Sequence, residues 1–233
     1  MGVSTQVTDF ADLRRDLIVR LRDATGVTAT EQIANRYLNT ALHDVHLAPG
    51  GAFSWAIRRA VLNTHDDYTT GTVAIALATR TTVTGVSTLW NTAVTGMGFN
   101  NTRAGGKMTF SGSTEVYEVS AVGSDTSITL ADRYIGAAAL AAGSSYTYFE
   151  DEYALATDFF RPLNFREFSS DLGIPLIGES WFRRRYPRNS TTGVPKVAAI
   201  FQKSYATDIT PRYRVVFHPA PDAMYSVPYS YIT

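Results

Sequence analysis

The sequence predicts an α+β fold in which one domain is interrupted by another. An N-terminal α-helical hairpin and a C-terminal segment of helix and β-hairpin are expected to form one domain from residues 1–70 and 150–233. Residues 71–149 are expected to form an inserted small all-β barrel or sandwich. Three observations predict this arrangement: helical spacing of apolar residues near the start, a Thr-, Val-, Ser- and Gly-rich middle, and mixed helix and strand patterns near the end.

Two amphipathic helices are predicted first. Thr8 or Asp9 can cap the first helix and Gly26 ends it, while Thr28 and Glu31 have the capping-box spacing for the second. Neither helix can bury its apolar stripe alone, so the pair is expected to pack against more of this chain or against other copies of it. The stripes consist of Phe10, Leu13, Leu17, Ile18 and Leu21, and of Ile33, Ala34, Tyr37, Leu38, Ala41, Leu42 and Val45.

The middle of the chain has the alternation and turn residues of a β structure. A strand is predicted over residues 53–62, and polar residues 63–67 then lead into the stretch 71–149. There, β-branched and aromatic residues that suit a pleated surface are separated by glycines that mark turns. Their regular spacing favours a small barrel or sandwich. The expected strands are 73–78, 83–86, 107–110, 115–122, 127–130 and 145–149.

The last third mixes helix and strand signals. It opens on a short acidic run, residues 150–152. Ser180 or Glu179 is expected to begin a short helix that Pro187 closes. The expected strands are 197–201, 213–217 and 225–231, with a turn at 219–222 between the last two.

Composition narrows the classes of function. The chain has 233 residues, of which 45% are hydrophobic and 18% charged, and this suits a folded protein. Lys+Arg and Asp+Glu both number 21, so the formal net charge is zero, whereas a general nucleic-acid binder has a basic excess. Near-zero net charge favours association into assemblies. The absence of cysteine excludes disulfides, Cys-ligated zinc and a Cys nucleophile.

No targeting or membrane segment is predicted. The first residues lack the basic and apolar regions of a secretion signal. The longest run of small apolar residues, 135–142, is far shorter than the ~20 residues that span a bilayer. The expectation is a protein made in the cytosol with no membrane partner.

Motifs for chemistry are weak throughout. His43 and His46 have a spacing at which two imidazoles can share a metal, with residues 65–67 as further candidates, but no third ligand follows from the sequence. The Gly-Gly-Lys of residues 105–107 lacks the rest of a phosphate-binding loop and leads into a strand. No Gly-x-Ser-x-Gly is present. We therefore expect no catalytic residue, no metal and no cofactor. The carboxylates considered as an acid/base pair are Glu115, Glu118, Asp151 and Glu152.

The strongest charge cluster is arginine-rich and flanked by aromatic residues. Arginine forks suit phosphates and aromatic rings can stack on bases, which is one interpretation. The favoured alternative is that the aromatic side chains pack inward while the arginines face solvent or acidic residues of a neighbour, with residues 150–152 as such a partner. The cluster comprises Arg183, Arg184, Arg185 and Arg188, with Trp181, Phe182 and Tyr186.

Several segments together resemble the head-to-tail adaptor (connector) proteins of tailed bacteriophages. Residues 153–159, Tyr-Ala-Leu-Ala-Thr-Asp-Phe, resemble their Tyr-x-Leu-Pro-x-Asp-Phe segment, with Ala156 in place of the Pro. The helix pair and the β stretch also match in order. The other segments are Ser-Trp-Phe-Arg-Arg-Arg-Tyr-Pro (180–187), Gly-Val-Pro-Lys-Val (193–197), Arg-Val-Val-Phe-His-Pro-Ala-Pro-Asp (214–222) and Tyr-Ser-Val-Pro-Tyr (225–229).

The resemblance implies a structural virion protein without enzymatic activity. It implies a dodecameric ring at the head–tail junction that docks under the portal protein and contacts the tail nozzle or other tail and neck proteins. DNA would pass through its lumen without sequence specificity. Subunit and portal contacts are expected at Leu13, Leu17, Tyr37, Leu38 and Trp181, with Arg183, Arg184, Arg185 and Arg188 facing a neighbour or DNA.

Two other classes remain open from the sequence. The β stretch is also compatible with a receptor- or glycan-binding unit of a tail-tip or fibre-associated protein. A cell-wall hydrolase is the weaker alternative.

Overall fold

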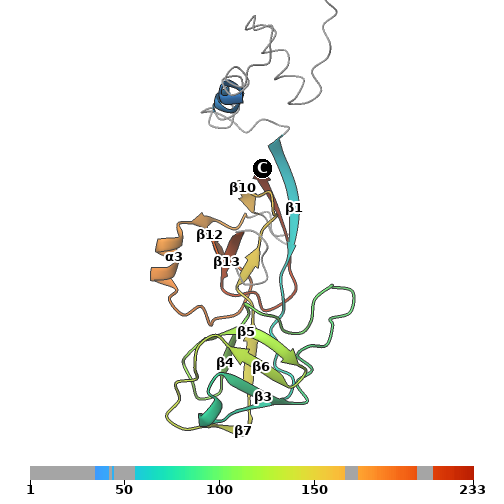
Figure 1. The fold of residues 1–233 in the computed structure, drawn as a ribbon, viewed down its shortest axis with the longest axis vertical. Helices are drawn as coiled ribbons and strands as arrows, with labels where there is room; N and C mark the ends of the chain where they lie inside the picture. The colour runs from blue at the N-terminus through green and yellow to red at the C-terminus, as the bar shows by residue number, and fades with distance from the viewer. Residues whose placement is uncertain (1–34, 42–43, 45–55, 166–172, 204–211) are drawn as a thin grey trace, which may run out of the picture. The chain divides into compact units, whose positions relative to one another are not determined.

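A computed structural model describes residues 35–41, 44, 56–165, 173–203 and 212–233 (Figure 1). The chain divides into two compact units, Met1–Phe53 and Ser54–Thr233. In the first unit, residues 35–41 and Asp44 are α-helical, within the range predicted for the second helix. The predicted first helix, including Leu13 and Leu17, lies outside the described residues.

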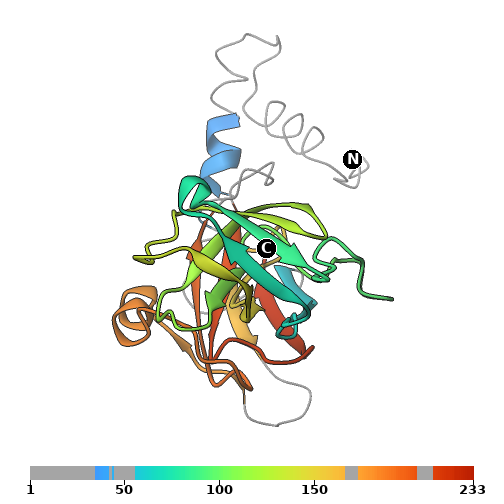
Figure 2. The same cartoon turned by 90° about the horizontal axis from the view of Figure 1, so that it is seen from below.

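A curved seven-stranded antiparallel sheet occupies the middle of the chain (Figure 2). Its order is β7-β2-β3-β6-β5-β4-β8. The two edge strands, β7 and β8, are consecutive in the chain, with only Ser145 between them. The chain thus passes directly from one edge of the sheet to the other, and the sheet is a half-barrel. Its strands are β2 (Thr72–Ile75), β3 (Thr82–Val86), β4 (Lys107–Phe110), β5 (Tyr117–Ser124), β6 (Ser127–Leu130), β7 (Leu140–Ser144) and β8 (Tyr146–Phe149).

One face of this sheet is a closed apolar core. In β3, Val83 is buried while Thr82 and Thr84 on either side are not, as the period of two of a strand requires. Trp90 is fully buried, and its indole N–H donates to the hydroxyl of Tyr146 at 2.8 Å. A buried indole needs such a partner because an unpaired N–H is costly. The core also contains Val73, Ile75, Met108, Phe110, Tyr117, Val119, Ile128, Leu130, Tyr134, Leu140 and Tyr148.

Gly106 allows the fully buried Tyr148 ring to lie directly on the backbone. A Cβ at Gly106 would overlap the ring and hydroxyl of Tyr148. We expect Gly106→Ala to lower the free energy of unfolding by about 1–3 kcal/mol, the usual cost of overpacking a core. Urea denaturation measures this. Gly123→Ala, whose Cβ would meet Ser127 only at ordinary contact distance of 3.6 Å, is the control. Equal losses for the two variants would contradict the packing argument.

Two smaller sheets are formed by the residues before and after the half-barrel. One has the order β11-β12-β13-β9, and the other has the order β1-β14-β10. All their pairings are antiparallel except that of β11 with β12. Their strands are β1 (Ile57–Asn63), β9 (Glu152–Ala154), β10 (Arg161–Phe165), β11 (Leu176–Ile177), β12 (Val197–Gln202), β13 (Tyr213–His218) and β14 (Ser226–Ile232).

These two sheets share a second core. Along β14, Val227, Tyr229 and Tyr231 are buried, and the alternate residues Ser226, Pro228 and Ser230 are partly exposed. The short helix α3 (Glu179–Arg185) packs on β12 through the fully buried Phe182. The shared core also contains Leu62, Tyr153, Leu155, Phe159, Phe165, Ile174, Ala198, Val215 and Phe217.

The α+β prediction is wrong, because the structure is mostly β. Within the described residues, α-helix is confined to 35–41, Asp44 and α3. The C-terminal segment contains the expected short helix, α3, but most of its strands join two sheets with β9, β10 and β1. The weak strands β9 and β10, which contain Glu152, Pro162 and Asn164, form because the apolar strands β13 and β14 offer edges to pair with. No helix within the described part of the chain is long and apolar enough to cross a membrane.

Candidate functional site

The acidic run between β8 and β9 lies in the interior of the second unit. Glu150, Asp151 and Glu152 are exposed by 4%, 1% and 7% of their surfaces. Three adjacent carboxylates at this depth require cations and donors around them, because an unpaired buried charge is strongly disfavoured. The structure supplies these partners from distant parts of the chain. We call this set the ionic cluster; it comprises the acidic run with Arg103, Lys107, Arg183, Asn189 and Lys203.

Glu150 is held by a guanidinium and a phenol. Its two oxygens accept from Nε and Nη2 of Arg103 at 2.7 and 2.5 Å, the bidentate geometry that suits arginine and carboxylate. The hydroxyl of Tyr148 donates to the same carboxylate at 2.6 Å. Burial first, then the charge of Glu150, raises the pKa of the Tyr148 phenol, so this hydroxyl keeps its proton. Glu150 therefore connects the loop before β4 to the end of β8.

Asp151 is fully buried and pairs with one cation and one amide. Its Oδ2 accepts from Nζ of Lys107 at 2.7 Å and from Nδ2 of Asn189 at 2.9 Å. Its Oδ1 has no hydrogen-bond partner among the described residues. Burial raises the pKa of Asp151, and Lys107 opposes that rise.

Glu152 receives three cations. Arg183 Nη2 and Lys203 Nζ each lie 3.2 Å from its carboxylate, and Lys107 Nζ lies at 3.5 Å. Burial alone would raise the pKa of Glu152, but Lys107, Lys203 and Arg183 together lower it to about 2. Glu152 is therefore the charged centre of the cluster at neutral pH.

The cluster and its neighbours connect the half-barrel to α3 and to the sheet β11-β12-β13-β9. Lys203, after β12, also pairs with Glu118 of β5 at 2.9 Å. Arg188, after α3, pairs with Glu115 at 2.9 Å. The residues of the Lys203–Glu118 pair are 85 positions apart in the sequence. Both ion pairs are contacts within one chain.

The arginine cluster is thus divided between two roles. Arg183 and Arg188 pair with acidic residues of this same chain, whereas the sequence interpretation placed such partners on a neighbour. Arg184 and Arg185 are exposed and have no ion-pair partner within the described ranges. The acidic run does receive an arginine, Arg183, as expected, but from within the chain.

The aromatic residues of this segment also divide. Phe182 is fully buried, and Tyr186 is half-buried and stacked on His218 with centroids 3.6 Å apart. Both pack inward as predicted. Trp181 does not, since 54% of its surface is exposed. Of the remaining predicted contact residues, Tyr37 is 62% exposed in the first unit and Leu38 is buried there.

Of the residues considered for metal or phosphate binding, His65 and Lys107 contact other residues of the chain. His43 and His46 lie outside the described residues. His65 is fully buried, and its two ring nitrogens lie 2.6 and 3.1 Å from the carbonyl oxygens of Asp66 and Asn100. No group of three or more potential metal ligands is found in the part of the chain that the structure describes. Lys107, at the end of the Gly-Gly-Lys segment, is engaged by Asp151.

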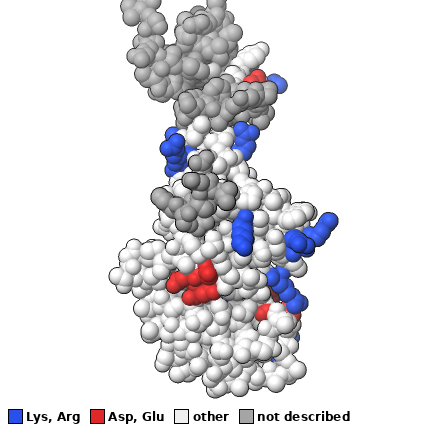
Figure 3. Space-filling model, turned by 180° about the vertical axis from the view of Figure 1, so that it is seen from behind, with Lys and Arg blue, Asp and Glu red and all other residues white. Residues whose placement is uncertain are grey.

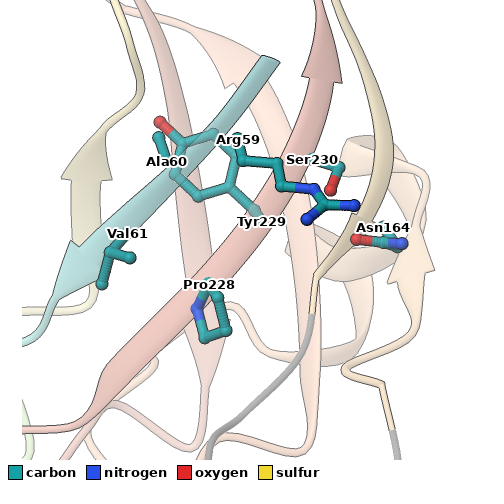
Figure 4. A pocket seen from close by; sticks show the side chains of 7 residues that line it. All are labelled: Arg59, Ala60, Val61, Asn164, Pro228, Tyr229 and Ser230. Atoms are coloured by element: carbon teal, nitrogen blue, oxygen red, sulfur yellow. The ribbon is translucent and has the colours of Figure 1, made fainter. Parts of the chain in front are cut away.

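A separate feature is a groove of about 520 Å³ on the sheet β1-β14-β10, shown in Figure 4. Its lining includes Arg59, Val61, Asn164, Pro228 and Ser230. The Arg59 side chain extends from β1 across β14 toward Ser230 and Asn164. No local sequence pattern predicts this groove, because it depends on the pairing of β1 with β14 near the end of the chain.

Charge on the surface is dispersed. On the face shown in Figure 3, Lys and Arg side chains are separated by uncharged surface rather than joined in one basic tract. A continuous basic stripe is the usual footprint of a nucleic-acid interface. This face therefore lacks that footprint over the residues described.

No protein-family model, curated protein or solved structure matches the chain.

Proposed function

We propose that this chain is a structural subunit of a tailed-bacteriophage virion, a head-to-tail adaptor. In this proposal, copies of the chain assemble into a ring that docks under the portal and joins the capsid to the tail, with DNA passing through the lumen. The adaptor resemblance of the sequence is the starting point, and the location of the resembling residues supports it.

The observation that carries the proposal is that three of the five resembling segments meet in one core. Tyr153, Leu155 and Phe159 from the first segment are buried against Phe217 from the β13 segment and Tyr229 from the last. Phe159 stands 5.5–6.4 Å, centroid to centroid, from tyrosine rings of β13 and β14. The other two segments contribute Phe182 and Val197 to a neighbouring cluster with Ala199 and Val216. Short motifs that come together in one core are those a shared fold would keep, so chance similarity is a poorer account of the three segments that meet there.

The chemistry of the ionic cluster supports a role without catalysis. Glu150 and Glu152 both line a cavity of about 240 Å³, which makes them the best-placed carboxylate pair for a hydrolase. A general acid needs a pKa near the working pH, whereas Lys107, Lys203 and Arg183 overcome burial and lower the pKa of Glu152 to about 2. Its strong ion pairs suit a rigid joint between the half-barrel and the sheet β11-β12-β13-β9.

The surface available for assembly lies on α3. Trp181, Arg184 and Arg185 are exposed on this helix, and exposed tryptophan and arginine are the residues enriched in binding hot spots. The α-helical hairpin, which was expected to pack against more of this chain or other copies of it, is not part of the proposal.

The test is assembly with the portal protein of the same phage. We expect light scattering and negative-stain microscopy to find rings that cap the portal. The double variant Arg184→Glu/Arg185→Glu is expected to weaken portal binding or ring formation at least tenfold, because it reverses two exposed charges that have no ion-pair partner among the described residues. Arg133→Glu, an exposed arginine on the half-barrel, is the matched control and should bind as the wild type does.

Other results would point elsewhere. A trimer that ignores the portal and binds cell-surface glycans would favour a tail-tip protein. Release of soluble fragments from peptidoglycan would favour a hydrolase. Either result would overturn the adaptor proposal.

A further inference from the structure

The groove on the sheet β1-β14-β10 is built from cross-strand rows of side chains. Strand pairing places Arg59 directly opposite Ser230, and Ser230 opposite Asn164 on the other side. Directly opposed residues share a face of the sheet, about 4.5–5.5 Å apart at Cβ. The three polar side chains therefore form one row across three strands, as Figure 4 shows.

Apolar residues flank this polar row on β1. Val61, paired with Pro228, lies two residues to one side, and Ile57 lies two residues to the other. Val61 is 56% exposed and Ile57 36% exposed. Positions two apart on a strand are about 6.6 Å apart. Along β1, this face therefore presents an apolar, a polar and an apolar residue in turn, each about 6.6 Å from the next.

The polar row has unused hydrogen-bonding capacity. Arg59 makes no ion pair or side-chain hydrogen bond with any described residue, and the same holds for the side chains of Asn164 and Ser230. A guanidinium brings five N–H donors, an amide two and a hydroxyl one. Among the described residues that line the groove, none has an acidic side chain. The complement of this row is an acceptor with negative charge, and a carboxylate matches the planar fork of arginine.

A nucleic acid fits the groove less well than a peptide. Among the described lining residues, Arg59 alone brings a guanidinium, between apolar walls from Val61 and Pro228. Phosphate backbones are bound by several cations along a path, and their binding energy comes mainly from that multiplicity. An extended peptide instead supplies alternate side chains with the spacing of the three rows.

We propose that this groove binds an extended segment of a partner protein with the pattern apolar-x-acidic-x-apolar, whose carboxylate is received by Arg59. The apolar residues of the segment pack on Val61 with Pro228 and on Ile57, and Asn164 and Ser230 donate to the remaining carboxylate lone pairs. The site is independent of ring formation, so it goes beyond the adaptor proposal. It adds a preference for partner segments that carry a carboxylate, which no sequence motif of the chain predicts.

The test uses fluorescein-labelled Val-Ser-Glu-Ser-Val and the matched amide peptide Val-Ser-Gln-Ser-Val, both blocked at their ends, with the full chain. Fluorescence anisotropy is expected to give at least tenfold tighter binding of the Glu peptide. Arg59→Gln removes that preference, and Asn164→Asp, which places a carboxylate in the row, abolishes binding of the Glu peptide. Arg133→Gln on the half-barrel is the control and should bind within twofold of wild type.

Three results would overturn the proposal. They are equal binding of the two peptides, an unchanged preference in Arg59→Gln, and absence of binding at millimolar peptide. Tighter binding of a single-stranded oligonucleotide that is lost in Arg59→Gln would also overturn it, in favour of a phosphate site. Circular dichroism of each variant establishes that the fold is intact. Loss of peptide binding with intact portal rings, or the converse, separates this site from the adaptor proposal.

Discussion

Glu152→Gln is expected to lower the free energy of unfolding at pH 7 by about 2–3 kcal/mol. Its carboxylate is 2% exposed and faces Lys107, Arg183 and Lys203. Removing one member of a fully buried pair costs about 3–5 kcal/mol, because a charge is left without compensation. The expected loss is smaller here, since the Arg183 and Lys203 side chains are 43% and 31% exposed and solvent screens them. Urea denaturation followed by circular dichroism measures it.

The stability loss in Glu152→Gln is expected to be larger at neutral pH than at acidic pH. Burial would raise the pKa of Glu152, but its three cations lower it from the ordinary 4.5 to about 2. A carboxyl with a depressed folded-state pKa stabilises the fold fully above its unfolded pKa, and this contribution disappears as pH falls through the folded value. The difference between wild type and Glu152→Gln should therefore be largest above about pH 4.5 and shrink toward pH 2.

Glu179→Gln is the matched control for this prediction. Glu179 pairs with the same Arg183 at 3.8 Å, but its side chain is 48% exposed. Its replacement should change the free energy of unfolding by less than about 0.5 kcal/mol, as is usual for surface pairs. A similar loss in both variants, or a Glu152→Gln loss that stays constant down to pH 2, would contradict the role given to the ionic cluster.

Tyr229→Ala is expected to lower the free energy of unfolding by about 3–5 kcal/mol, the range for deleting a large aromatic side chain from a core. Tyr229 is 4% exposed in the central strand β14, and its ring stacks on Phe165 with centroids 5.0 Å apart. The rings of Phe159 and Tyr231 also lie beside it, with centroids 6.4 and 5.5 Å from that of Tyr229. The deletion leaves a cavity between two sheets that these neighbours cannot fill without moving β14.

Tyr229→Phe separates packing from hydrogen bonding at the same position. The Tyr229 hydroxyl accepts the backbone N–H of Ala156 at 3.0 Å. Removing it leaves that donor without its partner and should cost about 1 kcal/mol. Thermal and urea denaturation of the two variants give the comparison. A Tyr229→Ala loss below about 1 kcal/mol would mean that the resembling segments do not form the core described for them.

Local patterns in the sequence located most of the strands. Residues 107–110 and 127–130 were predicted within the bounds of β4 and β6, because alternating β-branched and aromatic residues between glycines leave few other conformations. The short helix near Ser180 was also predicted from a local signal, the Pro187 that follows it closely. The prediction failed for β9 and β10, whose residues have little preference for strands and take that form only beside β13 and β14.

The candidate sites were less accessible to sequence reasoning. The acidic run at 150–152 was singled out, and so was Arg183, but their pairing was assigned to a neighbouring molecule. Nothing in the sequence reveals that Lys107 and Lys203 also converge on Glu152, because these contacts join residues that are 45 or more positions apart. The groove at Arg59 was missed for the same reason. Its row exists only through the pairing of Arg59 with Ser230.

By itself, the sequence determined the local conformations, the positions of the turns, the zero net charge and the absence of cysteine chemistry. These follow from side-chain shape, backbone preference and composition, which act over a few residues. Only the tertiary structure decided that the fold is mostly β, that three carboxylates are buried together, and that Arg59 lines a groove without an ion-pair partner among the described residues. Those outcomes come from strand pairing and burial between distant residues, whose energies depend on which neighbours the whole fold brings into contact.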